Sequence, residues 1–208
     1  MKRFAILLGS AAALIAAPLA AQTTAITGGK VVIGDGSAPI EGGTVLIRND
    51  RVVAAGANVN IPADARRIDA TGKWVTPGIF AGFSRIGLVE VGAVTQTNDM
   101  NSSGSPFSAA LDVQYAVNPF ASPVAVNRAA GVTRAVVSPS TSSSIFGGYG
   151  AVVDLGQDEN PITKARAFQF VELGETGHSR AGGSRSASHI QFRALLNEAR
   201  TYARNPAE

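Results

Sequence analysis

Short apolar segments separated by glycine-rich turns fill residues 22–77, and this pattern constrains the fold more strongly than any other. Segment 44–48 alternates apolar and polar residues, as a half-buried β-strand does. Asn49 and Asp50 connect it to a second such run, 51–55, so the two runs are predicted to form a β-hairpin. Because no helical period occurs here, we expect residues 22–77 to form a small β-sandwich or part of one.

The first 21 residues have the composition of a secretory signal peptide. Lys2 and Arg3 precede an apolar stretch at 4–17, and mostly small residues follow at 18–21. The apolar stretch is shorter than the roughly 20 residues that span a bilayer. We therefore expect a signal peptide over 1–21, export to the periplasm or the extracellular space, and no membrane attachment after cleavage.

The composition excludes several classes of function. The formal net charge of +3 falls to about +1 once Lys2 and Arg3 are removed, so we expect no nucleic-acid partner. The chain contains no cysteine, which excludes disulfides, thiolate catalysis and cysteine-bound metal. Hydrophobic residues make up 45% of the chain, enough for a packed core rather than intrinsic disorder.

Three segments carry a resemblance to a known family, and they follow one another between residues 26 and 78: ITGGKVVIGDG, GGTVLIRNDRVVAAG and IDATGKWVTPG. Their order resembles the N-terminal region of the amidohydrolase superfamily, metal-dependent hydrolases of non-peptide carbon–nitrogen bonds that include imidazolonepropionase-like enzymes and dihydroorotases. The resemblance implies an α/β fold with an N-terminal β-sandwich subdomain over 22–77. A TIM-like (β/α) barrel would then begin at Gly78.

The same resemblance implies where a metal would bind. In the family, Thr-Pro-Gly precedes a strand that ends in Asp-x-His-x-His, and these histidines bind a divalent cation, typically zinc. The corresponding residues here are Ala81, Phe83 and Arg85. Phenylalanine has no lone pair, and a guanidinium is a permanent cation with donors only. We therefore expect this degenerate motif to hold no metal or other cofactor, and this chain alone to be inactive.

The two histidines, His178 and His189, suggest no replacement metal site. Their separation of eleven residues places them on neither a common helix face nor a common strand face. His178 lies in a glycine- and serine-rich stretch that predicts a flexible loop, and His189 lies near a predicted helix start. We expect both to be surface or capping residues.

The pattern after Gly78 predicts part of a barrel. Ser122 as N-cap and Pro123 begin a helix that Gly131 ends, and a buried strand over 132–137 follows. Together these elements make one βα step of a TIM-like barrel.

Four further segments complete the prediction. Residues 138–150 predict a serine- and glycine-rich loop, with a phosphate cradle as the less favoured alternative. Strands over 151–155 and 165–173 and an amphipathic helix over 186–204 follow. Residues 78–208 amount to about half of the roughly 250 residues of a complete (β/α)₈ barrel. We therefore expect an incomplete, truncated TIM-like barrel with open sheet edges, which favour a partner.

Three functions are compatible with these features. We favour an exported amidohydrolase-family protein without metal chemistry, either an inactive homologue or a fragment. An active hydrolase would need Glu90 or Asp99 as a carboxylate and Arg85 as electrophile, but Arg85 is equally expected to form an ion pair with Glu90. Asp99 and Asp112 are expected to be solvated. A non-catalytic envelope subunit would pair with a second copy or with an intact amidohydrolase paralogue.

Overall fold

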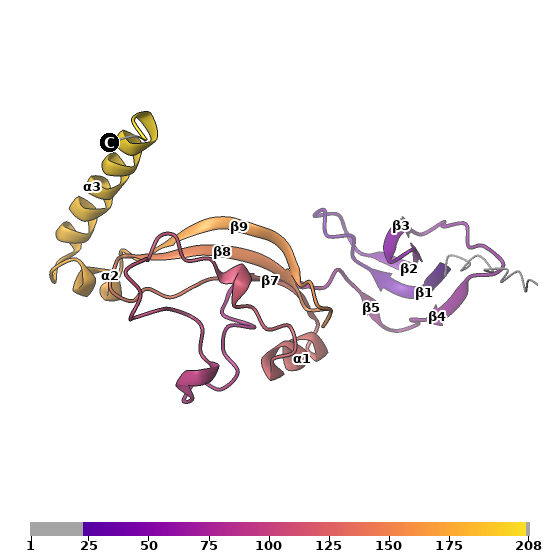
Figure 1. Ribbon diagram of the computed structural model, residues 1–208. Coiled ribbons are helices and arrows are strands. Elements are labelled where there is room, and N and C mark those ends of the chain that lie inside the picture. The colour runs from indigo at the N-terminus through magenta and orange to yellow at the C-terminus, as the bar shows by residue number, and fades with distance from the viewer. Residues whose placement is uncertain (1–22, 207–208) are drawn as a thin grey trace, which may run out of the picture. The chain divides into compact units, whose positions relative to one another are not determined.

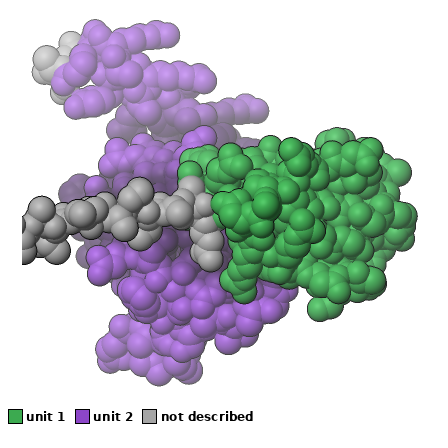
Figure 2. All heavy atoms as spheres, turned by 90° about the vertical axis from the view of Figure 1, so that its right-hand side faces the viewer, with its two compact units in different colours: residues 1–77 green, residues 78–208 purple. Residues whose placement is uncertain are grey.

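The computed structural model describes residues 23–206, and the predicted signal peptide lies outside them. The chain divides into two compact units, unit 1 ending at Pro77 and unit 2 beginning at Gly78 (Figures 1 and 2). None of the helices within the described range is long and apolar enough to cross a membrane.

Unit 1 is built on one mixed sheet of five strands. These are β1 (Thr23–Val31), β2 (Ile40–Arg48), β3 (Arg51–Gly56), β4 (Arg66–Asp69) and β5 (Trp74–Val75). Their order is β3-β2-β1-β4, and β5 also pairs with β1. The described residues form one sheet rather than two layers, because β4 and β5 both extend the same sheet by pairing with β1 in parallel; the sheet is compatible with part of the predicted β-sandwich.

The predicted hairpin in unit 1 is confirmed. Strands β2 and β3 pair antiparallel, and the connecting residues Asn49 and Asp50 have φ angles of 50° and 58°. Two successive left-handed residues make a turn of the I′ kind, whose twist matches that of the flanking strands. Asn and Asp adopt this backbone conformation more readily than other non-glycine residues.

Unit 2 contains a four-stranded mixed sheet ordered β6-β7-β8-β9. The strands are β6 (Ile79–Ser84), β7 (Val132–Val137), β8 (Phe146–Asp154) and β9 (Ile162–Val171), with helix α1 (Ser122–Ala129) between β6 and β7. Strands β6 and β7 run parallel, whereas β7–β8 and β8–β9 are antiparallel pairs. Only the β6–α1–β7 step therefore follows the predicted barrel pattern.

The short connections explain this departure from a barrel. A parallel crossover needs a dozen or more residues, but β7 is joined to β8 by residues 138–145 and β8 to β9 by 155–161. Chains this short return as antiparallel strands. The described residues thus form a mixed α/β fold with two sheets and few helices, and the partial TIM-like barrel is not confirmed.

The helices of unit 2 lie close to where the sequence places them. Helix α1 begins at Ser122, although Ala121 rather than the predicted serine occupies the N-cap position. Helix α3 (Arg185–Arg204) confirms the predicted terminal helix, and the Ser184 hydroxyl caps it by accepting a hydrogen bond of 3.0 Å from a backbone N–H of its first turn. Helix α2 (Glu175–Arg180) precedes it, and single 3₁₀ turns occur at η1 (Thr95–Thr97) and η2 (Val113–Tyr115).

The core of unit 2 lies on one face of the four-stranded sheet, which we call the covered face. Nine buried hydrophobic residues form it: Leu88, Val113, Ala121, Val124, Ala135, Val137, Ala151, Val153 and Leu155. In the strands they alternate with residues of the opposite face, as the pleat requires. Helix α1 and the segment 85–121 supply the cover, and both lie on the same side of the sheet (Figure 1).

Candidate functional site

A β-bulge distorts the strand end at which the sequence predicts the degenerate metal motif. Ala81 pairs with Ala135 but Ser84 pairs with Val137, so β6 contains one extra residue between the two pairs. A bulge interrupts the alternation of side chains along a strand. Ala81 packs against the buried core, whereas Phe83 is 60% exposed. The two-residue spacing therefore does not place Ala81 and Phe83 on one side of β6.

Phe83 and Arg85 lie together, and Phe83 also contacts β9. The guanidinium carbon of Arg85 lies 5.7 Å from the ring centroid of Phe83, and the ring centroid of Phe170 lies 6.2 Å from that of Phe83. The cation–π contact holds the guanidinium against an aromatic face. The Nε of Arg85 is buried, and no described residue accepts a hydrogen bond from it. Neither side chain therefore offers a lone pair to a metal, and Arg85 adds a fixed positive charge.

A cavity of about 320 Å³ adjoins β6, and its walls include Arg85 and Glu90. The Glu90 carboxylate accepts hydrogen bonds from the backbone N–H of Ser122, at 3.0 Å, and from the Ser122 hydroxyl. These two hydrogen bonds hold the pKa of Glu90 below its usual range. The predicted Arg85–Glu90 ion pair is wrong, because the ion pairs of the described residues are Lys30–Glu41 and Asp112–Arg166.

The carboxylates of the neighbouring loop are not arranged around Arg85. Asp99 lines a separate cavity of about 160 Å³, whose walls do not include Arg85. Asp112 is buried rather than solvated as predicted: its side chain is 3% exposed and lies 2.7 Å from the Nε of Arg166. Burial raises the pKa of Asp112, but hydrogen bonds from Arg166 and Gln114 outweigh that effect and hold it below the usual value.

The two histidines lie on helices and form no common site. His178 lies in α2 rather than in the predicted loop, and its Nδ1 is buried without a described hydrogen-bond partner. His189 is exposed on α3. Within residues 23–206, no group of three or more His, Cys, Asp and Glu side chains is placed to hold a metal. These residues do not fit the divalent cation that the resemblance implies, and we assign no chemical step to one.

Two backbone amides of the serine-rich segment before β8 are bonded within the chain. The predicted loop over 138–150 is shorter than expected, because β8 begins at Phe146. The N–H of Ser138 donates to the Ser84 carbonyl at 2.9 Å, and the N–H of Ser140 donates to the Met100 carbonyl at 2.7 Å. Amides that are already bonded in this way do not offer the free donors of a phosphate cradle.

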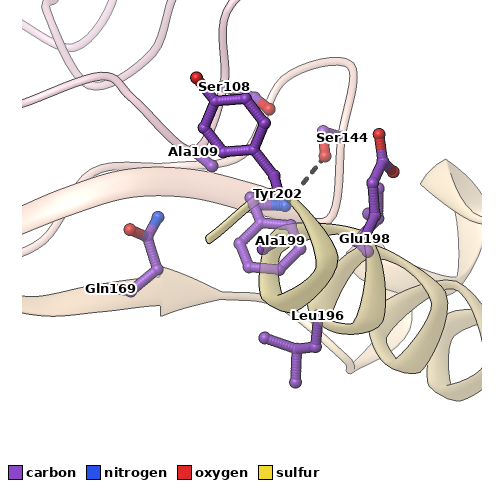
Figure 3. A pocket seen from close by; sticks show the side chains of 10 residues that line it. Ser108, Ala109, Ser144, Gln169, Leu196, Glu198, Ala199 and Tyr202 are labelled. Carbon is purple, nitrogen blue, oxygen red and sulfur yellow. Dashed lines mark hydrogen bonds between the residues drawn. The ribbon is translucent and has the colours of Figure 1, made fainter. Parts of the chain in front are cut away.

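A wider cavity, of about 550 Å³, lies between α3 and the strands β8 and β9 (Figure 3). Phe146, Leu195 and Leu196 make its wall largely apolar, and Ser108 and Ser144 add hydroxyl groups. No histidine or lysine lines it, and Glu198, the one carboxylate in its wall, forms no hydrogen bond with either serine among the described residues, so neither serine is paired with a base that would make it a nucleophile. The cavity has space for an apolar group but no catalytic pair.

The sheet face opposite the covered face carries a cluster that sequence reasoning missed. We call it the phenylalanine face, and it consists of Phe80, Phe83, Phe168 and Phe170. Phe80 and Phe83 are 52% and 60% exposed, and the two residues of β9 are half-buried. The Phe168 ring fills the space above Gly150, and the Phe170 ring lies beside Gly147. The alternating pattern at 165–173 was the sequence signal for this face.

Comparisons with known proteins agree with part of the resemblance seen in the sequence. No protein-family model and no curated protein matches the chain. Among solved structures, an amidohydrolase from Thermotoga maritima MSB8 matches with a TM-score of 0.75 and 26% identity, over 88% of this chain and 49% of that one. A molinate hydrolase is 33% identical over 34% of this chain and 15% of its own, with a TM-score of 0.30. The chain is thus similar in structure to an amidohydrolase and spans about half of that relative's length.

Proposed function

We propose that the chain is an amidohydrolase-like protein that does not itself carry out metal-dependent hydrolysis of carbon–nitrogen bonds. The observation that supports this most strongly is the end of β6. Phe83 and Arg85, which the resemblance aligns with two metal-binding histidines, stack on each other at 5.7 Å instead. A guanidinium fixed at that position repels a divalent cation, and the phenyl ring cannot ligate one.

The N-terminal sequence supports a further part of this proposal, namely that the protein is exported and acts in the periplasm or outside the cell. Lys2 and Arg3 followed by the apolar stretch 4–17 have the order of a secretory signal. Cell fractionation with an antibody against unit 2 tests this directly. Protein that stays in the cytoplasm at its full-length mass would contradict export.

Metal analysis tests the loss of metal chemistry. The purified chain, exposed to excess zinc and then desalted, is expected to retain far less than one equivalent by mass spectrometry of the metal. A Phe83→His, Arg85→His double variant puts back two imidazoles and removes the guanidinium, so it is expected to retain more zinc than the native chain. Tight binding of one equivalent by the native chain, with a hydrolase activity that a chelator abolishes, would contradict the proposal.

The phenylalanine face favours a second candidate function, a non-catalytic subunit that pairs with an amidohydrolase paralogue or with another copy of itself. Exposed aromatic clusters commonly mark interaction sites. Co-expression of the tagged chain with an intact paralogue from the same genome tests the first pairing. Capture of the paralogue should be lost in a Phe80→Asp, Phe83→Asp variant. A paralogue captured equally well by that variant would exclude this face as the contact.

A further inference from the structure

The phenylalanine face has no cover among residues 78–206, whose packing segments lie on the opposite side of the sheet. Phe80 and Phe83 are 52% and 60% exposed. Removing such side chains from water is favourable. A cluster of this size therefore favours association with another apolar surface.

We propose that the phenylalanine face binds the same face of a second copy of this chain in a two-fold symmetric dimer. This inference deepens the assembly role described above and rests on it. A partner for this face must itself present an uncovered apolar surface. The chain's own sheet has such a face.

The charges beside the cluster make the surface complementary to itself. Arg134 of β7 and Asp154 of β8 are paired across the sheet and lie on the same face as Phe80, which pairs with Arg134. Neither forms an ion pair within the described residues. A two-fold axis places each surface patch against its own copy, so Arg134 can meet the partner subunit's Asp154. An apolar centre with a mixed polar margin is the usual composition of an interface.

The extent of the sheet also fits a second copy. It has four strands, and its outer strands β6 and β9 each pair with one neighbour only among the residues described. Two copies of this sheet that pack face to face would bury both phenylalanine faces against each other, as the two sheets of a β-sandwich do.

Sedimentation equilibrium of the full chain over a series of concentrations tests the proposal. The native chain is expected to show a monomer–dimer equilibrium. A Phe80→Asp, Phe83→Asp variant should raise the dimer dissociation constant by at least about tenfold, because it buries charge in the apolar centre. Phe107→Asp, Phe120→Asp is the matched control, since these residues are 64% and 60% exposed but lie in the segment that packs on the covered face. The control should dimerise like the native chain.

Exchanging the charges of Arg134 and Asp154 provides a second, independent test. Arg134→Asp should weaken the dimer, and the combined Arg134→Asp, Asp154→Arg variant should restore it, because the exchanged pair is again complementary across the two-fold axis. Restoration distinguishes a contact between copies from a general loss of folding.

Several outcomes would overturn the dimer. These are a native chain that is monomeric at every concentration, a dimer that the Phe80 and Phe83 substitutions leave unchanged, equal weakening by both substitution pairs, or open-ended association. Concentration-dependent hydrogen exchange of the native chain avoids mutation altogether: protection of 79–84 and 162–171 should rise with concentration, and that of 105–111 should not. The zinc measurement is made separately, so failure of the dimer and failure of the metal-free proposal are distinguishable.

Discussion

The two faces of the sheet β6–β9 differ in what covers them. On the covered face, Val137, Ala151 and Val153 are at most 2% exposed and pack beneath α1 and the segment 85–121. On the phenylalanine face, Phe80 and Phe83 remain more than half exposed. The covered face is completed by segments that follow β6 directly in the chain. The other face has no cover among the described residues of unit 2, and it is the face that the proposed dimer would use.

The two faces are expected to differ most in how much the free energy of unfolding falls when a large side chain is truncated to alanine. Leu88 on the covered side is 1% exposed, so Leu88→Ala leaves a cavity and should lower the free energy of unfolding by about 3 kcal/mol. Phe80→Ala removes a larger side chain but should lower it by less than about 1 kcal/mol in the monomer. Urea unfolding at low protein concentration measures both. Equal costs would mean that the two faces are equally buried.

Two glycines of β8 allow a finer comparison of the two faces. An alanine at Gly148 would point toward the covered face, and an alanine at Gly150 would point toward the phenylalanine face. A Cβ at Gly148 would meet the backbone carbonyl of Leu111, and its φ of 115° is unfavourable for alanine. Gly148→Ala should therefore destabilise unit 2 by about 2–3 kcal/mol. At Gly150 the three atoms nearest to a Cβ all belong to the half-buried Phe168 ring, a side chain rather than backbone.

Gly150→Ala should accordingly cost less than about 1 kcal/mol. Thermal unfolding of the two variants alongside the native chain gives the comparison. If Gly150→Ala proved as costly as Gly148→Ala, the Phe168 ring would have to be held in place by a further surface packed on the phenylalanine face.

The smallest expected effect concerns the charge buried beside η2. Asp112→Asn should cost about 1–2 kcal/mol at neutral pH, since it replaces a charged acceptor of the Arg166 and Gln114 hydrogen bonds. The pKa of Asp112 lies below its usual value in the folded chain, so the ionised group stabilises the fold above the unfolded pKa of about 3.9. That contribution is lost as the pH falls through the folded value.

The stability difference between native chain and Asp112→Asn should therefore shrink under acid conditions. Urea titrations at neutral pH and near pH 3 would show it. A difference that grew as the pH fell would indicate that Asp112 is protonated in the folded protein.

Elements with a strong local signal could be predicted from the sequence. Asn49-Asp50 between two alternating runs is enough to specify the β2–β3 hairpin, and the apolar stripe of 186–204 is enough for α3. The direction of a strand within its sheet is harder to predict from the sequence. It depends on the length of the connections and on which strand becomes the neighbour. The helix, glycine and strand at 122–137 correctly predict one βα step, but the short connections after β7 turn the next strands antiparallel.

The candidate site shows the same limit at the level of single residues. The motif spacing correctly identifies the strand end, and the chemistry of Phe83 and Arg85 can be read from the sequence. The side of β6 on which Ala81 lies relative to Phe83 cannot be read from the sequence. It depends on the bulge between Ala81 and Ser84, which arises from strand pairing and not from the local sequence. His178 likewise lies in a helix whose glycine- and serine-rich sequence predicts a loop.

Thiol labelling tests the contrast between the two faces most directly, and the absence of cysteine from the native chain makes it clean. A single cysteine in place of Phe80 should react with a thiol reagent as an exposed group at low protein concentration and become protected as the concentration rises. A single cysteine in place of Ala151, which is fully buried, should react slowly at every concentration. A Phe80→Cys thiol that is equally reactive at all concentrations, or as unreactive as Ala151→Cys in the monomer, would contradict the account.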